Sequence, residues 1–336
     1  MCRIWYNEDR IREAPMKAGD SAKRTIVLYD ILLKHSDESH RISMPELIAA
    51  LAEQGIQADR RTVYQSLRAL NESHHPVRYS RFEKAGYYAE HPFTAAQAMI
   101  LTDAVQSALF LDDADAAEIT RRIAGQLSEA QAEEAVRTLP APAGRTDNRQ
   151  VLATIGTLLK SIHDCTPVQF RYYDMTISRQ KAYRHQNERY CLAPYALILN
   201  GGRYYCVFYS EKHGGFASFR VDKMEQVFRT DLPADPKPFD LDAYLRSSFR
   251  MYSGEGQTAV IEFDLSLVNV VFDEFGQDIL ISAVTDHAFT AAIRTALTPT
   301  FLSWLLQFED RCRVRRPQAL IRQMLELADS LKKKYA

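Results

Sequence analysis

The stretch "GGRYYCVFYS", residues 201–210, is a run of strand-forming residues that begins with a pair of glycines. Aromatic and β-branched side chains favour a strand, and glycines favour the turn before it. Because successive side chains of a strand point to opposite faces, Tyr204 and Cys206 share one face, and Arg203 and Tyr205 share the other. We therefore predict a strand with an apolar inner face and an outer face that carries a cation beside an aromatic ring.

Short runs of the same kind lie on both sides of this stretch. They read "VQFRYYD" (168–174), "RYCLAPYALI" (189–198) and "FASFRVDKM" (216–224), and glycine, asparagine and charged residues separate them. Several short strands at such spacing predict a small barrel or sandwich.

Residues 189–227 resemble the core of the WYL domain. That family is marked by a Pro-aromatic pair, a Gly-Arg lead into a Trp-Tyr-Leu strand, and a later strand that ends in Phe-Arg-Leu-Asp-Arg. The corresponding residues here are Pro194 and Tyr195; Gly202 and Arg203; Tyr204, Tyr205 and Cys206; and Phe219, Arg220, Val221, Asp222 and Lys223. Three of them depart from the pattern, with Tyr204 for Trp, Cys206 for Leu and Lys223 for Arg, and each keeps the physical type.

The resemblance implies an architecture and a function for nearly the whole chain. WYL proteins are typically bacterial transcription regulators with an N-terminal winged helix-turn-helix, a helical connector, a small Sm/SH3-like β-barrel and a C-terminal extension called WCX. The stretch "LSWLLQFEDRCRVRRPQALIRQMLELADSL" (302–331) is similar to that extension. In this family the barrel is regarded as a sensor of nucleic-acid or nucleotide-type effectors.

A winged helix-turn-helix is also predicted from the residues themselves. Apolar residues recur at helical spacing between residues 22 and 34, Ser43 can cap a second helix, and Asp59 can cap a third. The stretch "HHPVRYSRFEKAGYYAE" (74–90) then reads as a two-stranded hairpin. Three short helices followed by a basic hairpin are typical of this DNA-binding fold.

The third helix and the hairpin carry positive charge that suits DNA. Between residues 60 and 84 there are six Lys or Arg residues and two acidic residues. Arginine recognises guanine edges or phosphates, and glutamine recognises adenine. We expect DNA contacts from Arg60, Arg61, Thr62, Tyr64, Gln65 and Arg68 on the helix, and from Arg78, Arg81 and Lys84 on the hairpin. The alternative is a solvated helix face beside a charged turn.

The strand region is basic as well. Between residues 166 and 229 there are ten Lys or Arg residues and five acidic residues. Arginine forks bind phosphate, and aromatic rings stack on bases. We expect effector contacts from Arg171, Tyr173, Arg184, His185, Arg189, Arg203, Tyr205, Ser218 and Arg220. The alternative is that the tyrosines are half-buried strand residues and that the arginines pair with Glu188, Glu211 or Asp222.

The remaining chain predicts a helical connector and a second mixed domain. The connector is strongly helical, holds seven acidic residues and three arginines between 112 and 139, and packs on itself or on a second subunit. After residue 256 the order of elements is that of the split βαβ arrangement with an extra helix. We predict an α+β multidomain protein with an N-terminal segment (1–17), a winged helix-turn-helix (18–91), a helical connector and dimerisation region (92–165), a WYL β-barrel (166–235), a linker (236–255) and a ferredoxin-like βαββαβ-type WCX extension (256–336).

Composition and motifs argue against an enzyme, a metal site or a cofactor. A hydrophobic share of 46% and a charged share of 25% are those of a globular protein. The five cysteines are odd in number and form no CxxC pair. No glycine-rich phosphate or dinucleotide motif, no HExxH and no GxSxG is present. No apolar run has membrane-spanning length, so we expect the cytoplasm.

Two functions of different class follow from the sequence. The first is a homodimeric regulator, a repressor rather than an activator, that binds double-stranded operator DNA and whose barrel binds a nucleotide or single-stranded nucleic-acid effector. The second is an accessory or defence protein without operator specificity that uses the barrel to bind single-stranded DNA, RNA or a partner.

Overall fold

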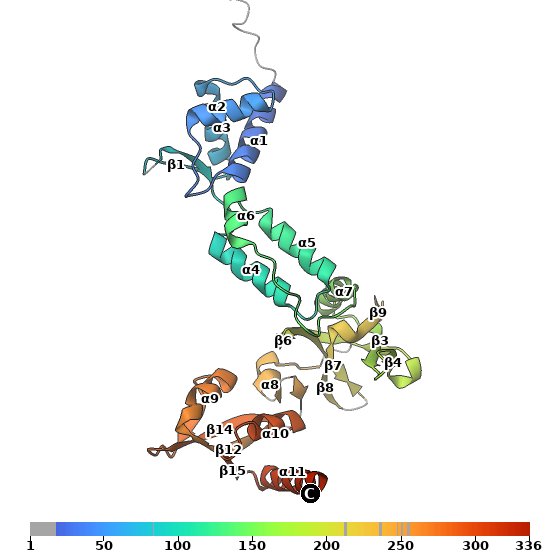
Figure 1. The fold of residues 1–336 in the computed structure, drawn as a ribbon. Coiled ribbons are helices and arrows are strands. Elements are labelled where there is room, and N and C mark those ends of the chain that lie inside the picture. Colours follow the sequence, from blue (N-terminus) through green and yellow to red (C-terminus); the bar gives the residue numbers. More distant parts are fainter. Residues whose placement is uncertain are drawn as a thin grey trace, which may run out of the picture. The chain divides into compact units, whose positions relative to one another are not determined.

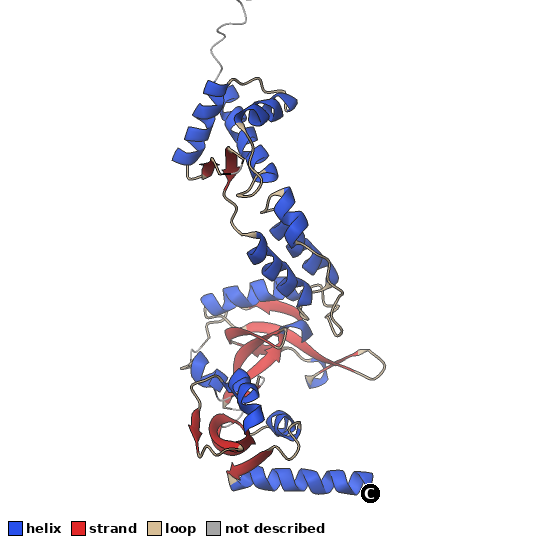
Figure 2. Ribbon diagram, turned by 60° about the vertical axis from the view of Figure 1, so that its left-hand side comes forward, coloured by secondary structure: helices blue, strands red, loops and turns tan. Residues whose placement is uncertain are grey.

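The computed structural model describes residues 18–336 except 83, 212–213, 235–236, 247, 250 and 254–255, and it leaves the side chains of residues 18, 19, 185, 246, 252 and 253 undescribed. The chain forms two compact units (Figures 1 and 2). Of the described residues, the first unit holds 18–108 and 112–145, and the second holds 109–111 and 146–336. Each unit is described by itself below.

The first unit begins with three helices and a hairpin. These are α1 (Ala18–His35), α2 (Met44–Glu53), α3 (Arg60–Glu72), β1 (Val77–Ser80) and β2 (Gly86–Ala89). Ser43 and Asp59 cap α2 and α3 as predicted, each in a reciprocal capping box. A backbone bridge between Ile42 and Tyr87 joins the loop before α2 to the hairpin. The predicted winged helix-turn-helix fold is confirmed.

Leucine-rich faces of the three helices make the core of this fold. Leu28 and Leu32 of α1, Leu47 and Leu51 of α2, and Val63 and Leu67 of α3 are all buried together. Since α3 buries one stripe only, its opposite face stays in solvent.

Three further helices complete the first unit: α4 (Ala95–Ser107), α5 (Asp113–Ala124) and α6 (Glu129–Ala135). Ala98, Leu127 and Ala135 form their small core. Polar contacts join them to the winged helix-turn-helix. The Ser128 hydroxyl donates to the Asp37 carboxylate at 2.6 Å, and the His91 ring lies between the carbonyl oxygens of Ser36 and Gln126.

The second unit begins with α7 (Val151–His163) and seven strands. The strands are β3 (Val168–Met175), β4 (Lys181–Tyr183), β5 (Tyr190–Leu192), β6 (Pro194–Asn200), β7 (Arg203–Ser210), β8 (Gly215–Arg220) and β9 (Met224–Arg229). β3 pairs with β4, β5 and β9, and β6, β7 and β8 form the second sheet. One core of Phe170, Cys206, Phe208 and Met224 lies between the two sheets, and Leu158 of α7 packs on it. The predicted small β-barrel is therefore present.

A short helix and two short strands follow the barrel: α8 (Leu241–Arg246), β10 (Ser248–Phe249) and β11 (Tyr252–Ser253). Tyr244 and Met251 are buried against Val207 on the outer face of the β6–β7–β8 sheet. This segment therefore covers part of the barrel surface.

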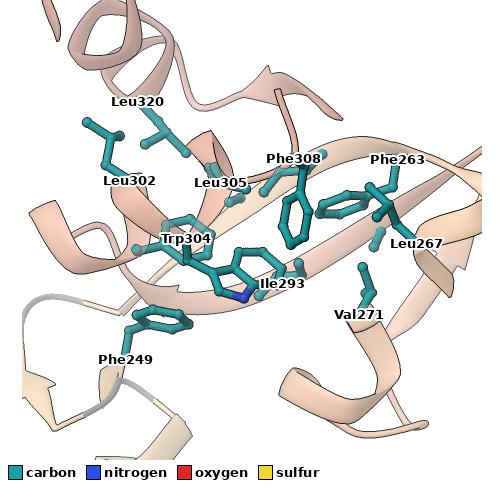
Figure 3. Close-up of a cluster of buried hydrophobic side chains, with 14 of the residues drawn as sticks. Phe249, Phe263, Leu267, Val271, Ile293, Leu302, Trp304, Leu305, Phe308 and Leu320 are labelled. Atoms are coloured by element: carbon teal, nitrogen blue, oxygen red, sulfur yellow. The ribbon is translucent and has the colours of Figure 1, made fainter. Parts of the chain in front are cut away.

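The C-terminal part has the predicted ferredoxin-like order. Its elements are β12 (Gly256–Asp264), α9 (Val268–Phe275), β13 (Leu280–Ser282), β14 (Ala288–Ala296), α10 (Pro299–Leu306), β15 (Cys312–Arg316) and α11 (Gln318–Tyr335). The sheet is antiparallel in the order β13–β14–β12–β15. Figure 3 shows Trp304 of α10 in the core, with the Phe308 ring 4.8 Å and the Phe249 ring 6.0 Å away between centroids.

Candidate functional site

The exposed face of α3 brings together five of the predicted DNA-contact residues. Val63, Leu67 and Leu70 face the core. On the opposite side, one shallow surface depression is lined by Arg60, Arg61, Tyr64, Gln65 and Arg68. The helical period that buries the leucines therefore gathers these polar side chains on one surface.

Some side chains on this surface already form hydrogen bonds or ion pairs with other residues, and others do not. Arg60 donates to the Tyr64 hydroxyl at 3.3 Å, and Arg68 pairs with Glu72 at 2.7 Å. The side chains of Arg61 and Gln65 form no hydrogen bond or ion pair with any described residue. These two side chains are therefore open to a ligand.

Thr62, also predicted to contact DNA, has a local role. Its backbone N–H donates to the Asp59 carboxylate at 2.8 Å, and its hydroxyl accepts from the Asp59 N–H at 3.0 Å. Thr62 thus closes the capping box that starts α3, which positions Arg60 and Arg61 at the N-terminal end of the helix.

The hairpin carries the other three predicted DNA-contact residues. Arg78 pairs with Glu90, and Lys84 pairs with Glu46 at 3.0 Å. Arg81 is exposed and has no partner among the residues that the structure describes. Both ion pairs lie at the surface, where such pairs contribute little stability, so each cation can exchange its carboxylate for a phosphate at small cost.

Two aromatic residues of the hairpin, Tyr79 and Tyr87, were not predicted as site residues, whereas Tyr64 of α3 was. Tyr64, Tyr79 and Tyr87 line a second depression next to the first. Hydrogen bonds from Tyr87 and Arg60 lower the pKa of Tyr64, and burial raises the pKa of Tyr87. The signal in the sequence was the alternation of aromatic and cationic residues in the hairpin.

The tip of the hairpin exposes an aromatic ring that was also not predicted as a site residue. The Phe82 side chain is 79% exposed. Arg41, in the loop before α2, donates to the Phe82 carbonyl and so holds the tip in place. The tip therefore presents an apolar ring beside Arg81, and Arg41 holds the backbone that carries this ring.

In the barrel, three of the predicted effector residues converge on Asp222. Arg203 donates to one carboxylate oxygen at 2.8 Å, and Arg220 donates to both, at 3.0 and 2.6 Å. The Tyr173 hydroxyl donates to the Asp222 backbone carbonyl at 3.1 Å. The Asp222 side chain is only 4% exposed, so this is a nearly buried carboxylate between two partly exposed guanidinium groups.

Tyr205 and Ser218 lie on the same face as Arg220 but are covered. Tyr205 pairs in register with Arg220 and packs in the cluster that contains Tyr244. The Ser218 hydroxyl donates to the Met251 carbonyl at 2.8 Å. Tyr205 and Val207 of β7 lie on this face, and Tyr244 and Met251 of the segment after the barrel pack against them.

The other predicted effector residues lie around β3, β4 and β9. Arg171 has a buried Nε atom without a hydrogen-bond partner, and its guanidinium carbon lies 5.9 Å from the Tyr183 ring. Arg184 pairs with Asp174 at 2.7 Å, and Arg189 donates to Gln226 at 3.0 Å. The His185 side chain lies outside the described residues.

Tyr172 links the two groups of residues. The Arg184 guanidinium lies 5.0 Å from the Tyr172 ring, and the Tyr172 hydroxyl accepts from the Arg220 backbone N–H at 3.3 Å. Burial raises the pKa of Tyr172 to about 12, so its hydroxyl stays neutral near neutral pH. The side chain of Arg184 and the backbone of Arg220 therefore contact the same tyrosine.

The turn before β7 also holds the short segment Leu109–Leu111. Gly202 has a φ of 72°, which favours glycine, and its carbonyl accepts from the Leu109 N–H at 3.0 Å. Arg203 lies 3.4 Å from the Leu109 carbonyl, and the Phe110 and Tyr204 rings pack edge to face at 4.6 Å. Leu109–Leu111 belongs to the second unit, whereas Ala108 and Asp112 belong to the first, so the connection between the units passes this turn.

Comparison with known protein families decides what the barrel and the C-terminal part are. The family model of the WYL domain matches residues 153–229, and that of the WCX domain matches residues 255–331. The chain contains a WYL domain and a WCX domain. The resemblance drawn from the sequence is thus confirmed, and the WYL match spans all nine predicted effector residues.

Comparison with solved structures adds a structural similarity. Proteasome accessory factor B/C (PafBC) of Arthrobacter aurescens matches 96% of this chain at 15% sequence identity with a TM-score of 0.27. The match covers 51% of the PafBC chain, so this chain spans about half the length of that protein. No curated protein matches significantly.

The cysteine in the core of the WYL domain is shielded from solvent. Cys206, at the third position of the WYL motif, is fully buried, and burial raises the pKa of its thiol. The described residues contain no cluster of three or more potential metal ligands, and none of their helices is long and apolar enough to span a membrane. The polar groups of the WYL domain described above are suited to holding anions.

Proposed function

We propose that this protein is a transcription regulator of the cytoplasm that binds duplex operator DNA as a homodimer and acts as a repressor. The observation that carries this proposal is the pair Arg61 and Gln65. Both side chains are unpaired among the described residues and lie on the exposed face of the third helix of a winged helix-turn-helix. The WYL and WCX domains that follow are typical of such regulators.

DNA recognition would use α3 in the major groove. Arg61 and Gln65 are one helical turn apart, so they can reach neighbouring base edges, with arginine suited to guanine and glutamine to adenine. Arg68 and Arg78 would exchange their exposed carboxylate partners for phosphates, and Arg81 would contact the backbone or the minor groove.

Effector binding would use the WYL domain. A phosphate or nucleotide that reaches Arg203 and Arg220 competes with the Asp222 carboxylate for the same guanidinium groups. Because Arg203 also contacts the Leu109 carbonyl, such competition changes how the WYL domain holds the connection to the first unit. This supplies a route by which an effector alters operator affinity.

The DNA-binding half is tested with single substitutions on α3. Arg61→Ala and Arg68→Ala should each weaken duplex binding by about 1–3 kcal/mol and lower the salt slope by about 1 where a phosphate contact is lost. Arg322→Ala on α11 is the matched control and should leave binding unchanged. Equal binding by all four proteins would show that α3 is not the recognition helix.

The effector half is tested with the double variant Arg189→Ala, Arg220→Ala. With ATP or a short single-stranded DNA as probe, the variant should lose the change in operator affinity that the probe causes in the wild type and should still bind the operator. Loss of folding would mean that these arginines are structural. Tighter binding to single strands than to duplex DNA would favour the accessory nucleic-acid-binding protein instead.

A further inference from the structure

Phe82, at the tip of the β1–β2 hairpin, has an exposed ring on a fixed backbone. The ring is 79% exposed and makes no ring or cation–π contact with any described residue. The Phe82 backbone N–H donates to the Ser80 hydroxyl at 3.2 Å, and its carbonyl accepts from the Arg41 guanidinium. A single exposed apolar side chain is ordinary on a protein surface, so its support and its surroundings decide what it can do.

Arg41 supports the tip through three backbone carbonyls. Its guanidinium donates to the carbonyl oxygens of Glu38 at 2.8 Å, of Phe82, and of Lys84 at 3.5 Å. Glu38 lies in the loop between α1 and α2, so this side chain joins that loop to the hairpin tip. Because all three acceptors are neutral, Arg41 keeps a positive charge beside the tip. A tip that is held in place loses less conformational entropy when it binds a ligand.

Positive charge lies on both sides of the Phe82 ring. Between residues 78 and 84 the sequence has three cations and one acidic residue. Arg81 directly precedes the ring and has no partner among the described residues. Lys84 follows it, and its ion pair with Glu46 is exposed to solvent. A ligand that suits this tip must therefore offer a slot for an aromatic ring between anionic groups.

The minor groove of duplex DNA offers this combination. Phosphates line its edges, and proteins that bind it insert apolar side chains, phenylalanine among them, between neighbouring base pairs. The negative potential of the groove attracts an arginine beside the inserted ring. An anionic membrane surface also accepts aromatic and basic side chains. Duplex DNA is favoured here because the same fold exposes Arg61 and Gln65 on α3.

We propose that Phe82 is a wedge that enters the minor groove of the operator and unstacks one base step, with Arg81 in the groove beside it. Insertion of this kind kinks the duplex by about 20–90°. Because pyrimidine–purine steps unstack most easily, the wedge selects a TA or CA step where the hairpin lies. Specificity then arises at base pairs that α3 does not read. The wedge rests on the proposed function, since it requires a protein that binds duplex DNA.

The wedge is tested with the full-length protein and a duplex selected from a random pool. Energy transfer between dyes at the two ends of the duplex measures the bend. 2-Aminopurine, placed at successive positions, becomes brighter where a base step is unstacked. The wild type should bend the duplex and brighten one position. Phe82→Ala should abolish both signals and weaken binding about tenfold or more, whereas Phe82→Leu keeps an apolar wedge and should retain most of the bend.

Tyr335→Ala is the matched control, because Tyr335 is also an exposed aromatic residue, at 81%. It should bind and bend the duplex like the wild type. Phe82→Ala should leave the salt dependence of binding unchanged, since no phosphate contact is lost. Arg81→Ala should instead lower the salt slope by about 1. The circular dichroism spectrum should be the same for all these variants, because each replaced side chain is exposed.

The positioning role of Arg41 is tested with Arg41→Lys. Lysine keeps the positive charge but lacks the planar fork that reaches several carbonyls at once. The bend should decrease while the salt slope stays the same, and adding Phe82→Ala should then cause no further loss of binding beyond that of Phe82→Ala alone. An unchanged bend in Arg41→Lys would overturn the role given to Arg41.

The outcomes separate the wedge from the proposed function. A wild type that binds the selected duplex without bending it, or a Phe82→Ala protein that bends it equally, overturns the wedge and leaves the regulator intact. A wild type that binds no duplex contradicts the regulator and the wedge together. Binding to vesicles that contain phosphatidylserine, lost in Phe82→Ala while the duplex bend is unchanged, would overturn the wedge in favour of a membrane contact.

Discussion

Asp222 is the ion-pair partner of two arginines in the WYL domain, Arg203 and Arg220. The sequence left two possibilities open, an anion site or structural ion pairs, and the structure shows Arg203 and Arg220 sharing one nearly buried carboxylate. Removing one partner of such a pair leaves the other charge uncompensated in a poorly solvated place. The structure therefore shows the ion pairs with Asp222, and an anion site at these arginines stays a prediction.

Asp222→Asn separates stability from binding at this site. The substitution leaves two guanidinium groups without their counter-charge, so we expect the free energy of unfolding to fall by about 2 kcal/mol. Inorganic phosphate or ATP should restore part of this loss, as measured by thermal unfolding with and without the anion.

The matched control is Glu72→Gln, which removes the exposed carboxylate beside Arg68. It should change stability by less than about 1 kcal/mol and should not respond to phosphate. An Asp222→Asn protein as stable as the wild type would contradict the role given to this carboxylate.

Single residues also show what strand alternation can and cannot predict. It placed Cys206 inside the barrel and Tyr205 on the opposite face, as the structure has them. It could not show that Tyr244 and Met251 cover that opposite face, because this contact joins strands to a segment more than 30 residues further along the chain. The sequence likewise gave no sign that Arg171 has an unpaired buried nitrogen.

Among the elements, the wing depends on one glycine. A Cβ atom at Gly86 would lie 2.9 Å from the carbonyl oxygen of Ile42, which is closer than real Cβ contacts allow. Gly86→Ala should therefore cost about 1–3 kcal/mol through overpacking and separate the hairpin from Ile42. The measurement is hydrogen exchange of the Tyr87 amide, which donates to that carbonyl at 2.8 Å and should exchange faster.

Gly125→Ala is the control for the wing. A Cβ at Gly125 meets its nearest neighbour at an ordinary 3.5 Å, and its φ of −66° suits any residue. Its Tyr87 exchange should match that of the wild type. Unchanged exchange in Gly86→Ala would show that the wing does not need this close approach.

The cap of α2 gives a pH dependence of known sign. The Ser43 backbone N–H and then Lys84 hold the pKa of Glu46 below its ordinary value of 4.5, at about 2. A lowered pKa in the folded state contributes stability above the unfolded pKa, and this contribution is lost as pH falls towards the folded one. The stability difference between wild type and Glu46→Gln should be constant above about pH 4.5 and shrink towards pH 2.

This difference is measured by chemical denaturation at several pH values. Glu53→Gln, on the same helix but away from the cap, is the control. A Glu46→Gln difference that stays the same down to pH 2 would contradict the capping role.

Local chemistry explains which elements were predictable. Ser43, Asp59 and Thr94 are strong N-caps followed by periodic apolar residues, and the helices begin at the next residue in each case. The order of elements after residue 256 was also predictable, because apolar residues recur at helical spacing in the helices and alternate in the strands. α8, β10 and β11 were read as linker, since elements of two to six residues depend on tertiary contacts and carry no periodic pattern.

For the whole molecule, we propose that the winged helix-turn-helix binds DNA and that the WYL domain binds the effector. The winged helix-turn-helix offers unpaired Arg61 and Gln65, and the WYL domain offers arginines held by Asp222. Leu109, in a short segment of the second unit, contacts Gly202 and Arg203 in the turn before β7. Sequence-specific duplex binding is the property on which the rest of this proposal depends.

The most direct measurement is the affinity of the full-length protein for a duplex selected from a random pool, compared with a scrambled duplex at the same salt concentration. The proposal predicts that the selected duplex binds at least about a thousandfold more tightly and that Arg61→Ala removes most of this preference. Equal affinity for both duplexes, or tighter binding to single strands, would contradict the proposal.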